Sequence, residues 1–400
     1  MSYARHFQRL TQLLARWQPL WRPLAFQHRR LPWAADYPEL YQTLLALDDD
    51  AAARLEYDPL ATEALAPWLP VAELRALVRL PEYPGRAAAL PNTWADHIAG
   101  RKWRQLQAFV RCVPETPGPL LEWCAGKGHL ARTLSRRDRR EVVGLEWQPA
   151  LCAQGQALAQ RQGAAVRLVE QDVLVDAAAR FLDADHHAVA LHACGDLHVA
   201  LLRHAVDKGF ALTLAPCCYQ RTAAAYYRPL SALGQRLAGD YAVELGREDL
   251  ALAVQETVTA PPAVSRQRER ANAWRLGFDL LQREVRGVDE YLSVPSLAYG
   301  KMPVDFAGFC RWAAEQKGLA LPPGILAQSD WEAAGGARLK EVKRLELVRH
   351  AYRRPLEVWL LLDRLMFLQE AGFDVSLATF CPRELTPRNA VLRATPGVAG

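Results

Sequence analysis

The sequence lacks the features that would assign the chain to a secretory route or a membrane. Its first residues contain no apolar segment of the signal-peptide kind, and no apolar run is long enough to span a bilayer. Its eight cysteines include no Cys-x-x-Cys pair and do not follow the spacing of a small secreted protein. We therefore expect a cytoplasmic protein without membrane contact.

Charge and composition are ordinary for a globular protein. Lysine and arginine number 49 against 44 aspartates and glutamates, and the resulting net charge of +5 permits an anionic partner without requiring one. Half of the 400 residues are hydrophobic, and no internal repeat or low-complexity tract is present. The chain is long enough for two or three structural units with a large core.

One stretch, from Pro119 to Leu130, predicts a strand, a tight loop and the start of a helix. Its sequence is Pro-Leu-Leu-Glu-Trp-Cys-Ala-Gly-Lys-Gly-His-Leu. Apolar residues lead into an acid, small residues follow, and the helix begins near Gly128 with its free backbone N–H groups facing the loop. Gly126 and Gly128 allow a ligand to approach the backbone closely. The loop indicates a nucleotide-like ligand.

Two ligands compete for this loop. Gly126 to Ala131 matches the dinucleotide pattern G-x-G-x-x-G/A, which favours NAD. However, Glu122 at the strand end would meet the pyrophosphate, whereas a carboxylate there suits the cationic amino-acid end of S-adenosylmethionine. Glu146, at the end of the next strand-like run, would accept a ribose diol. Asp172, after the third strand-like run, would accept a hydrogen bond from the adenine amino group. Three acids at successive strand ends favour S-adenosylmethionine.

Strands and helices alternate from about residue 96 to residue 222. After the first strand, the predicted strands cover 142–145, 166–169, 188–191 and 211–214, and the predicted helices cover 130–137, 148–162 and 177–182. This alternation predicts a parallel sheet covered on both faces. Ligands bind such sheets beyond the carboxyl ends of the strands. His192, Asp196 and Tyr219 follow the fourth and fifth strands there.

Three motifs in this order resemble a class I methyltransferase family. They are Glu-x-Cys-Ala-Gly-Lys-Gly-His-Leu (122–130), His-Ala-Cys-Gly-Asp-Leu (192–197) and Pro-Cys-Cys-Tyr (216–219). The family includes methyltransferase-like protein twenty-five and the ribosomal-RNA-adenine-dimethylase-domain-containing protein. The same motifs look like those of the eukaryotic tRNA 2′-O-methyltransferase acting in the acceptor stem. Segments similar to the closing part of the first group lie at 355–357, 361–365 and 386–389, and the resemblance covers about residues 94–222 and 351–395.

The resemblance implies an α/β fold, a class I (Rossmann-like) methyltransferase sheet with an antiparallel C-terminal edge. Apolar residues at helical spacing between residues 6 and 17, followed by frequent prolines, predict a helical N-terminal region over residues 1–95. Residues 96–222 would be the core that binds S-adenosylmethionine. Residues 223–350 would be a mostly helical insertion and the substrate region. Residues 351–400 would complete the sheet with strands at 373–380 and 390–394.

The resemblance also implies roles for residues in the loop and at the strand ends. Gly126 and Gly128 would hold the amino-acid part of S-adenosylmethionine, Glu146 the ribose and Asp172 the adenine. Family members usually have glycine where this chain has Cys124, and cysteine reaches positive φ less freely, so a shift of the loop is expected. The expected cofactor contacts are Glu122, Cys124, Gly126, Gly128, Glu146, Asp172 and His192.

The candidates for catalysis are less specific. His192, Asp196 and Tyr219 flank the expected methyl position, although a structural hydrogen-bonding role for His192 is an equal alternative. Cys217 and Cys218, with Tyr219, would form the rim that meets the substrate. The K-D-K-E arrangement of ribose methyltransferases cannot be assembled, and the Asn/Asp-Pro-Pro-aromatic motif of amino methyltransferases is absent.

Basic segments lie before the first strand and in the insertion. An amphipathic helix is expected over 94–112 with basic residues at 101–104, and further basic runs occupy 266–270 and 338–354. They would suit a nucleic-acid surface. Solvated helix faces are an equal explanation.

A group of histidines and cysteines also raises the question of a metal. Residues from adjacent strand ends could converge on zinc: His192, Cys194, His198, Cys217 and Cys218. Without a Cys-x-x-Cys pair, thiols in a sheet are usually buried packing residues. We therefore predict no metal ligand.

The sequence thus predicts an S-adenosylmethionine-dependent methyltransferase that acts on RNA, either tRNA or rRNA, without an obligate protein partner. One alternative is a methyltransferase whose substrate is a protein or a small molecule. Another is an inactive methyltransferase fold that serves as a binding protein. The intact Gly126, Gly128, Glu146 and Asp172 favour retained cofactor binding.

Overall fold

The structure is a computed structural model that describes residues 1–60, 63–85, 90–255, 262–297 and 299–397. The chain forms two compact units. The sheet unit comprises Met1–Ala15, Leu77–Glu256 and Arg353–Gly400, and the helical unit comprises Arg16–Ala76 and Thr257–Tyr352. Among the described helices, none combines the length and the apolar composition needed to traverse a bilayer.

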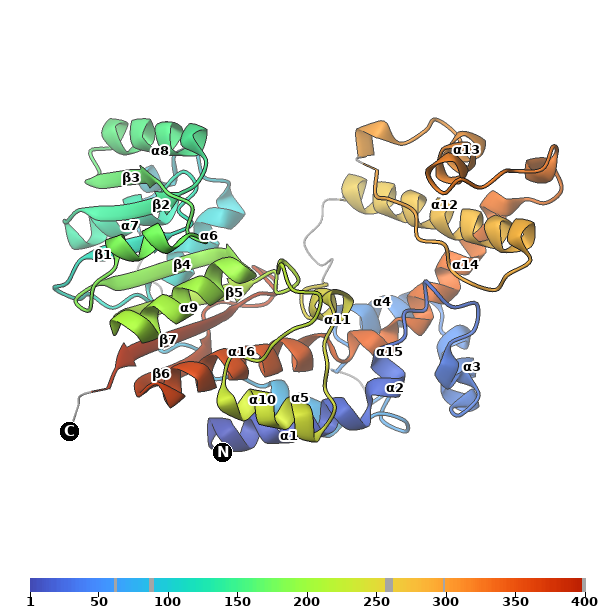
Figure 1. Cartoon of the computed structure of the whole chain (residues 1–400), viewed down its shortest axis with the longest axis horizontal. Coiled ribbons are helices and arrows are strands. Elements are labelled where there is room, and N and C mark those ends of the chain that lie inside the picture. Colours follow the sequence, from blue (N-terminus) through green and yellow to red (C-terminus); the bar gives the residue numbers. More distant parts are fainter. Residues whose placement is uncertain (61–62, 86–89, 256–261, 298, 398–400) are drawn as a thin grey trace. The chain divides into compact units, whose positions relative to one another are not determined.

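A seven-stranded sheet with the order β3-β2-β1-β4-β5-β7-β6 forms the centre of the sheet unit (Figure 1). Its strands are β1 (Leu120–Trp123), β2 (Val142–Glu146), β3 (Val166–Glu170), β4 (His187–Cys194), β5 (Ala211–Cys217), β6 (Phe373–Thr379) and β7 (Ala390–Pro396). The first five are mutually parallel, and β7 runs antiparallel to β5 and β6. The predicted α/β fold with an antiparallel C-terminal edge is confirmed. The strand order reverses beside β1, so the switch point where such sheets bind ligands lies between β1 and β4.

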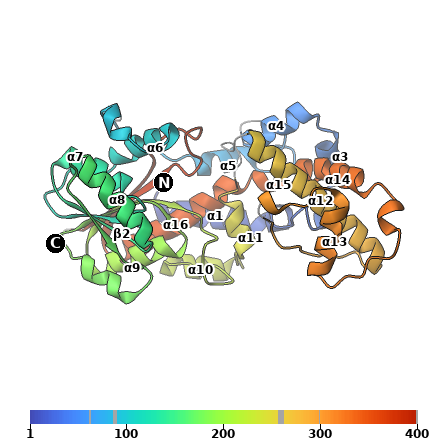
Figure 2. The ribbon, with the colours of Figure 1, turned by 90° about the horizontal axis from the view of Figure 1, so that it is seen from above.

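Helices cover both faces of this sheet. The helices of the sheet unit are α1 (Tyr3–Arg16), α6 (Gly100–Val110), α7 (His129–Asp138), α8 (Pro149–Arg161), α9 (Asp196–Lys208), α10 (Ala232–Asp240), α11 (Arg247–Leu252) and α16 (Arg353–Glu370). Helices α1, α10 and α11 pack against α16. Figure 2 shows α6 and α7 on one side of the sheet and α9 on the other. Leu106, Phe109, Leu134, Val142 and Val189 form part of the buried core between α6, α7 and the strands. Burial on both faces explains why the parallel strands are nearly continuous apolar runs.

The first helix joins the sheet unit through α16. Phe7, Leu10 and Leu14 recur at helical spacing on α1 and are fully buried. The Phe7 ring lies 5.2 Å from that of Trp359 on α16, and the Trp359 indole N–H donates to the Thr11 hydroxyl at 2.9 Å. The segment 1–95, expected as one helical region, is divided between the two units: residues 1–15 and 77–95 belong to the sheet unit, and residues 16–76 belong to the helical unit.

The helical unit is built around the long helix α12. Its elements are α2 (Gln18–Trp21), α3 (Pro38–Ala46), α4 (Asp49–Tyr57), α5 (Val71–Val78), α12 (Pro262–Arg286), α13 (Phe306–Gln316), α14 (Trp331–Leu345), α15 (Leu347–His350) and the 3₁₀ helices η1 (Pro32–Ala34), η4 (Tyr299–Lys301) and η5 (Ile325–Ala327). Helices α12 and α14 pack closely at Gly277 and Gly335, since a β-carbon on Gly335 would lie 2.5 Å from Gly277 N. Trp274 and Phe309 belong to a hydrophobic core of this unit that is separate from the core of the sheet unit.

Some predicted elements differ from the observed ones. The helix expected over 94–112 is shorter, because Asn92–Ala95 form a 3₁₀ helix, His97 has φ 64° and α6 begins only at Gly100. The short helix expected over 177–182 is the 3₁₀ helix η3 (Asp176–Phe181). Residues 223–255, expected in the insertion, belong to the sheet unit, where α10 and α11 contact α16.

Candidate functional site

The loop that leaves β1 is rich in left-handed residues. Cys124, Gly126 and Gly128 have φ values of 62°, 57° and 63°. Hydrogen bonds from Ala125 N to Leu145 O (2.8 Å) and from Gly128 N to Ala125 O (2.9 Å) anchor the loop to β2 and close its turn. Cys124 takes the conformation that glycine would take, so the expected shift of the loop is not required. A β-carbon on Gly126 would meet no protein atom within 4 Å, and the backbone there is open to a ligand.

The Glu146 carboxylate at the end of β2 is fixed beside this loop. Its Oε2 accepts a hydrogen bond from Gly126 N and its Oε1 from Gln148 N, each at 3.0 Å. The side chain is buried, yet each oxygen keeps a further lone pair. A vicinal diol can donate to both oxygens of a carboxylate held in this way. The geometry suits the ribose contact predicted for Glu146.

Glu122, at the end of β1, is more deeply enclosed. The residue is 5% exposed, and its Oε2 accepts from Ala131 N, in the first turn of α7, at 2.8 Å. Burial raises the pKa of this carboxyl group to about 8, against the opposing effect of the Ala131 hydrogen bond and of nearby Lys102 and Arg132. A cationic ligand group close to Glu122 would favour its ionised form.

Apolar side chains project where β2 and β3 end. Trp147, directly after Glu146, is 66% exposed, and Leu174 and Val175 in the loop after β3 are also exposed. Asp172 is exposed in the same loop, and its Oδ1 accepts from Leu174 N at 2.9 Å. Because β2 and β3 are neighbours, these residues border one corner of the carboxyl edge. The sequence analysis did not predict these three apolar residues. Trp147 could have been predicted, because it directly follows Glu146, the acid at the end of a strand.

The start of α9 holds the segment after β5 in place. Asp196 Oδ2 accepts from Ala223 N at 2.8 Å, and Asp196 N donates to Arg221 O at 3.0 Å. Gly195, with φ 55°, permits this contact, since a β-carbon on it would lie 1.8 Å from Arg221 O. Asp196, a predicted catalytic candidate, is therefore engaged in supporting the loop.

His192 lies at the end of β4 with an exposed side chain and an unusual backbone. Its φ of 74° is in the left-handed region, where a residue with a β-carbon is strained. Partial enclosure of the ring, together with the positive charges of Lys102 and Arg388, lowers the pKa of His192 to about 4. The imidazole is therefore neutral at physiological pH and able to accept a proton.

The Tyr219 side chain is buried and is not exposed at the carboxyl edge of the sheet. The residue is 2% exposed, and the Arg364 guanidinium carbon lies 4.8 Å from the centre of its ring. The His198 ring packs edge-on at 5.9 Å. Arg364 Nε donates to His198 Nε2 at 2.8 Å, so His198 Nδ1 donates to Ala193 O at 3.0 Å. The catalytic and substrate-binding roles predicted for Tyr219 would require this packing to open.

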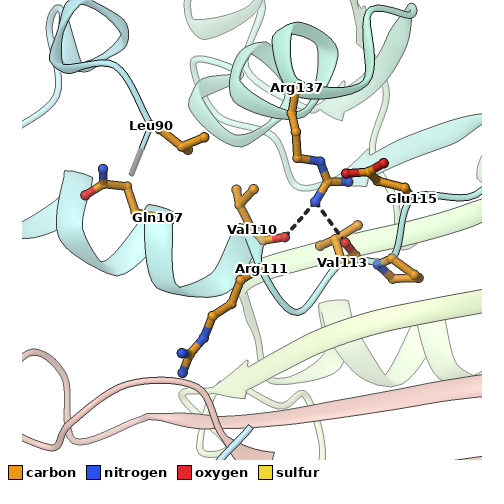
Figure 3. Close-up of a pocket in the computed structure, with 8 residues that line it drawn as sticks. Leu90, Gln107, Val110, Arg111, Val113, Glu115 and Arg137 are labelled. Carbon is orange, nitrogen blue, oxygen red and sulfur yellow. Dashed lines mark hydrogen bonds between the residues drawn. The ribbon is translucent and has the colours of Figure 1, made fainter. Parts of the chain in front are cut away.

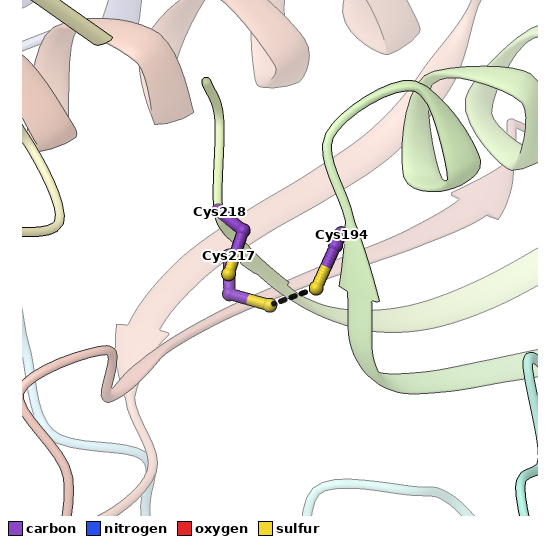
Figure 4. A group of neighbouring side chains, drawn as sticks. All are labelled: Cys194, Cys217 and Cys218. Atoms are coloured by element: carbon purple, nitrogen blue, oxygen red, sulfur yellow. Dashed lines mark hydrogen bonds between the residues drawn. The ribbon is translucent and has the colours of Figure 1, made fainter. Parts of the chain in front are cut away.

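Cys217 and Cys218, predicted to meet the substrate, form a group with Cys194 (Figure 4). Cys217 is buried, whereas Cys218 and Cys194 are partly exposed. The three thiols come from the adjacent ends of β4 and β5, beside His192.

Positive charge gathers on the same part of the edge. Lys102 on α6 acts electrostatically on Glu122 and His192, and Arg221 and Arg388 act on Cys218. None of these three cations forms an ion pair with a side chain in the described residues. This region therefore carries uncompensated positive charge.

A separate hollow of about 340 Å³ lies beside the segment that leads into β1 (Figure 3). Arg137 Nη1 donates to Val110 O and Val113 O, each at 2.8 Å, and Arg111 donates to Phe380 O at 2.9 Å. Both guanidinium groups that line the hollow are thus engaged with carbonyl oxygens. Because the hollow lies at the amino end of β1, it is not part of the carboxyl-edge site.

The residues at the carboxyl edge fit S-adenosylmethionine. Gly126 leaves the backbone open, Glu146 presents two oriented carboxylate oxygens, and Trp147 offers an exposed aromatic face for a base. Glu122 places a buried carboxyl group where a cationic ligand group would be stabilised. A pyrophosphate in the same position would lie beside the carboxyl groups of Glu122 and Glu146.

Comparisons with known proteins bear on the same region. Residues 101–225 match a family model described as a methyltransferase domain. Among solved structures, geranyl diphosphate methyltransferase in complex with GPP and sinefungin is 17% identical with a TM-score of 0.25, and it aligns over 44% of this chain and 64% of its own. Coclaurine N-methyltransferase bound to N-methylheliamine and SAH is 16% identical with a TM-score of 0.26, over 45% of this chain and 62% of its own. A possible exported protein from Bordetella parapertussis is 14% identical with a TM-score of 0.27, over 100% and 98%.

The chain spans less than two thirds of the length of the first two of these structures, and at such TM-scores none of the three bears on function. The family match is independent of them and falls on the parallel part of the sheet, from α6 to the segment after β5. Residues 101–225, less than a third of the chain, are thus similar to a methyltransferase domain, and the strand order agrees with this similarity.

Proposed function

We propose that the chain binds S-adenosylmethionine at the carboxyl edge of its sheet and transfers the methyl group to RNA. The observation that carries the proposal is the coincidence of the methyltransferase-domain match with a loop whose open Gly126 lies beside the fixed Glu146 carboxylate. The narrower resemblance to methyltransferase-like protein twenty-five and its relatives stays a prediction.

Some of the site residues would bind the methyl donor, and another would accept a proton from the methyl acceptor. When bound, S-adenosylmethionine supplies a methyl group activated by a positively charged sulfonium. Gly126 and Glu146 would hold its amino-acid and ribose parts, and Trp147 would cover its adenine. Asp196 is engaged with the loop after β5 and Tyr219 is buried, so we assign the proton-accepting role to His192, the remaining candidate and the one with an exposed side chain.

Positive charge beside His192 supports a polyanionic acceptor. Lys102, Arg221 and Arg388 carry uncompensated charge around the ends of β4 and β5. Phosphate groups of a nucleic acid bind such clusters through charge-assisted contacts. RNA therefore fits this part of the edge better than a neutral metabolite does.

In the helical unit, the basic segment 338–354 is largely used for internal contacts. Arg338 pairs with Glu341 at 2.7 Å, and Arg344 with Asp49 at 2.8 Å. Arg349 is buried and donates to Trp21 O at 2.9 Å. These arginines stabilise the unit, and we do not place RNA on them.

The start of α12 is the better surface for RNA within the helical unit. Arg266, Gln267 and Arg270 line an open hollow of about 280 Å³ together with Ala263. The Arg270 guanidinium also lies 4.9 Å from the Trp274 ring. Two exposed guanidinium groups one helical turn apart suit successive phosphates, and we propose this hollow as a second RNA contact.

A thermal-shift experiment tests donor binding. We expect S-adenosylmethionine but not NAD to raise the melting temperature, and Glu146→Ala to abolish the shift. Trp147→Ala should weaken binding roughly 5- to 150-fold, as base stacking is worth about 1–3 kcal/mol. The matched control is Glu170→Ala, an exposed acid at the end of β3, which should bind normally. Equal shifts with both ligands would contradict the proposal.

Labelling with radioactive methyl groups tests the acceptor. Label from S-adenosylmethionine should enter an RNA fraction, disappear after ribonuclease treatment and fall sharply in His192→Ala. Label that resists ribonuclease but not protease would assign the activity to a protein substrate. Donor binding without any transfer would indicate an inactive binding protein.

A further inference from the structure

Three cysteine sulfur atoms meet at the carboxyl ends of two adjacent strands (Figure 4). Cys194 ends β4, Cys217 ends β5 and Cys218 follows directly. The Sγ atoms of Cys194 and Cys217 are 3.5 Å apart, and all three lie within 4.8 Å of one another. The cluster is not explained by the loop and carboxylates that would hold a methyl donor.

The backbone is distorted in a way that brings these sulfurs together. Consecutive strand residues normally point to opposite faces of a sheet, which would separate Cys217 from Cys218. Cys218 instead has φ 48°, and the left-handed turn brings its side chain to the same side. On β4, a register irregularity between Leu191 and Cys194, with His192 at φ 74° inside it, aligns Cys194 with Cys217. Strain at residues with a β-carbon concentrates at functional sites.

We propose that Cys194, Cys217 and Cys218 bind a zinc ion through their three sulfur atoms. Zinc prefers thiolate ligands in tetrahedral geometry with Zn–S distances of about 2.3 Å, which separates the sulfurs by about 3.8 Å. The observed separations, from 3.5 Å up to 4.8 Å, require only small rotations to meet this value.

The surroundings decide what the fourth ligand is and how the charge is balanced. His198 does not contribute, since Arg364 occupies its Nε2 and Ala193 O its Nδ1. Among the described residues, no fourth histidine, cysteine or carboxylate lies within the group. Water or a substrate atom would complete the coordination, as at zinc sites that keep an open position. Arg221 and Arg388 act on Cys218 and would offset the single negative charge of a zinc ion with three thiolates.

Metal content of the full chain tests the proposal. The protein is purified without a metal-binding tag, dialysed and measured by plasma mass spectrometry, with an expected content of about one zinc per chain. Cys194→Ser, Cys217→Ser and Cys218→Ser should each lose most of it. Cys152→Ser, which removes a partly exposed thiol outside the cluster, should retain it. Equal zinc in all four variants would overturn the site.

Two measurements on the wild-type protein cover the case in which a cluster variant fails to fold. Cobalt added to metal-free protein should give the visible absorption of tetrahedral cobalt with thiolate charge transfer. Zinc should protect about three thiols from alkylation, which peptide mapping should locate at Cys194, Cys217 and Cys218. Absence of the cobalt spectrum, protection elsewhere, or a Cys194–Cys217 disulfide in the purified protein would refute the proposal. These readouts do not depend on methyl transfer.

Discussion

Replacing Glu122 with glutamine removes a buried carboxyl group while keeping the shape of the side chain. The amide oxygen of glutamine can still accept the hydrogen bond from Ala131 N that Glu122 accepts at 2.8 Å. What is lost is the ionisable group, whose pKa burial raises from 4.5 to about 8. The substitution therefore separates the contribution of the charge from that of the contact.

The direction of the pH effect follows from this raised pKa. Between pH 4.5 and about 8 the folded chain keeps a proton on Glu122 that the unfolded chain releases, so the free energy of unfolding falls as pH rises through this window. Each pKa unit corresponds to about 1.4 kcal/mol, which gives a loss of about 3 kcal/mol at pH 7 and about 4–5 kcal/mol above pH 8. Glutamine has no such loss.

Urea unfolding of wild type and Glu122→Gln at pH 5, 6, 7 and 8 measures the effect. We expect the stability of the variant relative to wild type to rise by about 3–4 kcal/mol from pH 5 to pH 8. Glu170→Gln, which removes an exposed carboxylate at the end of β3, should show no comparable trend. A difference for Glu122→Gln that is independent of pH would refute the reasoning.

The same variant tests the link between Glu122 and the proposed donor. A cationic ligand favours the ionised carboxyl group, so binding of S-adenosylmethionine to wild type at pH 7 should release up to about one proton. Calorimetry in buffers of different ionisation enthalpy measures this release. Glu122→Gln should release none and bind roughly tenfold or more weakly, because an amide cannot pair with the charge.

Three pairs of substitutions address the strained loops and their support. Cys124→Val should destabilise the protein by about 1–3 kcal/mol because a β-branched residue resists φ 62°, whereas Cys124→Gly should change stability by about 1 kcal/mol or less in thermal unfolding. Gly195→Ala should lower stability strongly, since the new β-carbon would lie 1.8 Å from the carbonyl oxygen of Arg221, and hydrogen exchange should show a disordered loop after β5. In the control Gly209→Ala, the new β-carbon would meet no atom within 4 Å, and the loss should be about 1 kcal/mol. Arg364→Lys should lose about 3 kcal/mol, because lysine cannot keep both the buried Nε hydrogen bond to His198 and the Nη1 hydrogen bond to Tyr227. Arg393→Lys changes a less buried arginine over the Tyr83 ring and should lose about 1 kcal/mol.

The parallel sheet and its ligand edge could be predicted because local sequence determines them. Apolar runs that end in Glu122 and Glu146 specify where strands stop, and glycines at 126 and 128 specify the turn. Carboxyl ends of parallel strands share one edge, so these positions had to lie near each other. The antiparallel closure came from the resemblance of the C-terminal segment and is confirmed by β6 and β7.

Features that depend on distant contacts could not be predicted in the same way. The enclosure of Tyr219 is made by Arg364, far along the chain, and nothing local to Tyr219 indicates it. The basic segment around Arg349 looked like a possible RNA surface, yet the guanidinium of Arg349 is buried against Trp21 O. The positive φ of Cys124 is likewise imposed by hydrogen bonds of the neighbouring backbone to β2.

The helix α16 connects the C-terminal segment of the chain to the candidate site. Asp363, fully buried, accepts hydrogen bonds from the Tyr227 hydroxyl and from the N and Oγ of Ser231, which fixes the chain beyond β5. Arg364, its neighbour, donates to His198 on α9, directly after β4. Adjacent residues of α16 thus support the segments that follow β4 and β5, the two strands at whose ends His192 and the three thiols lie. Because buried polar groups lose most when a single partner is removed, these two adjacent residues tie the C-terminal segment to the geometry of the site.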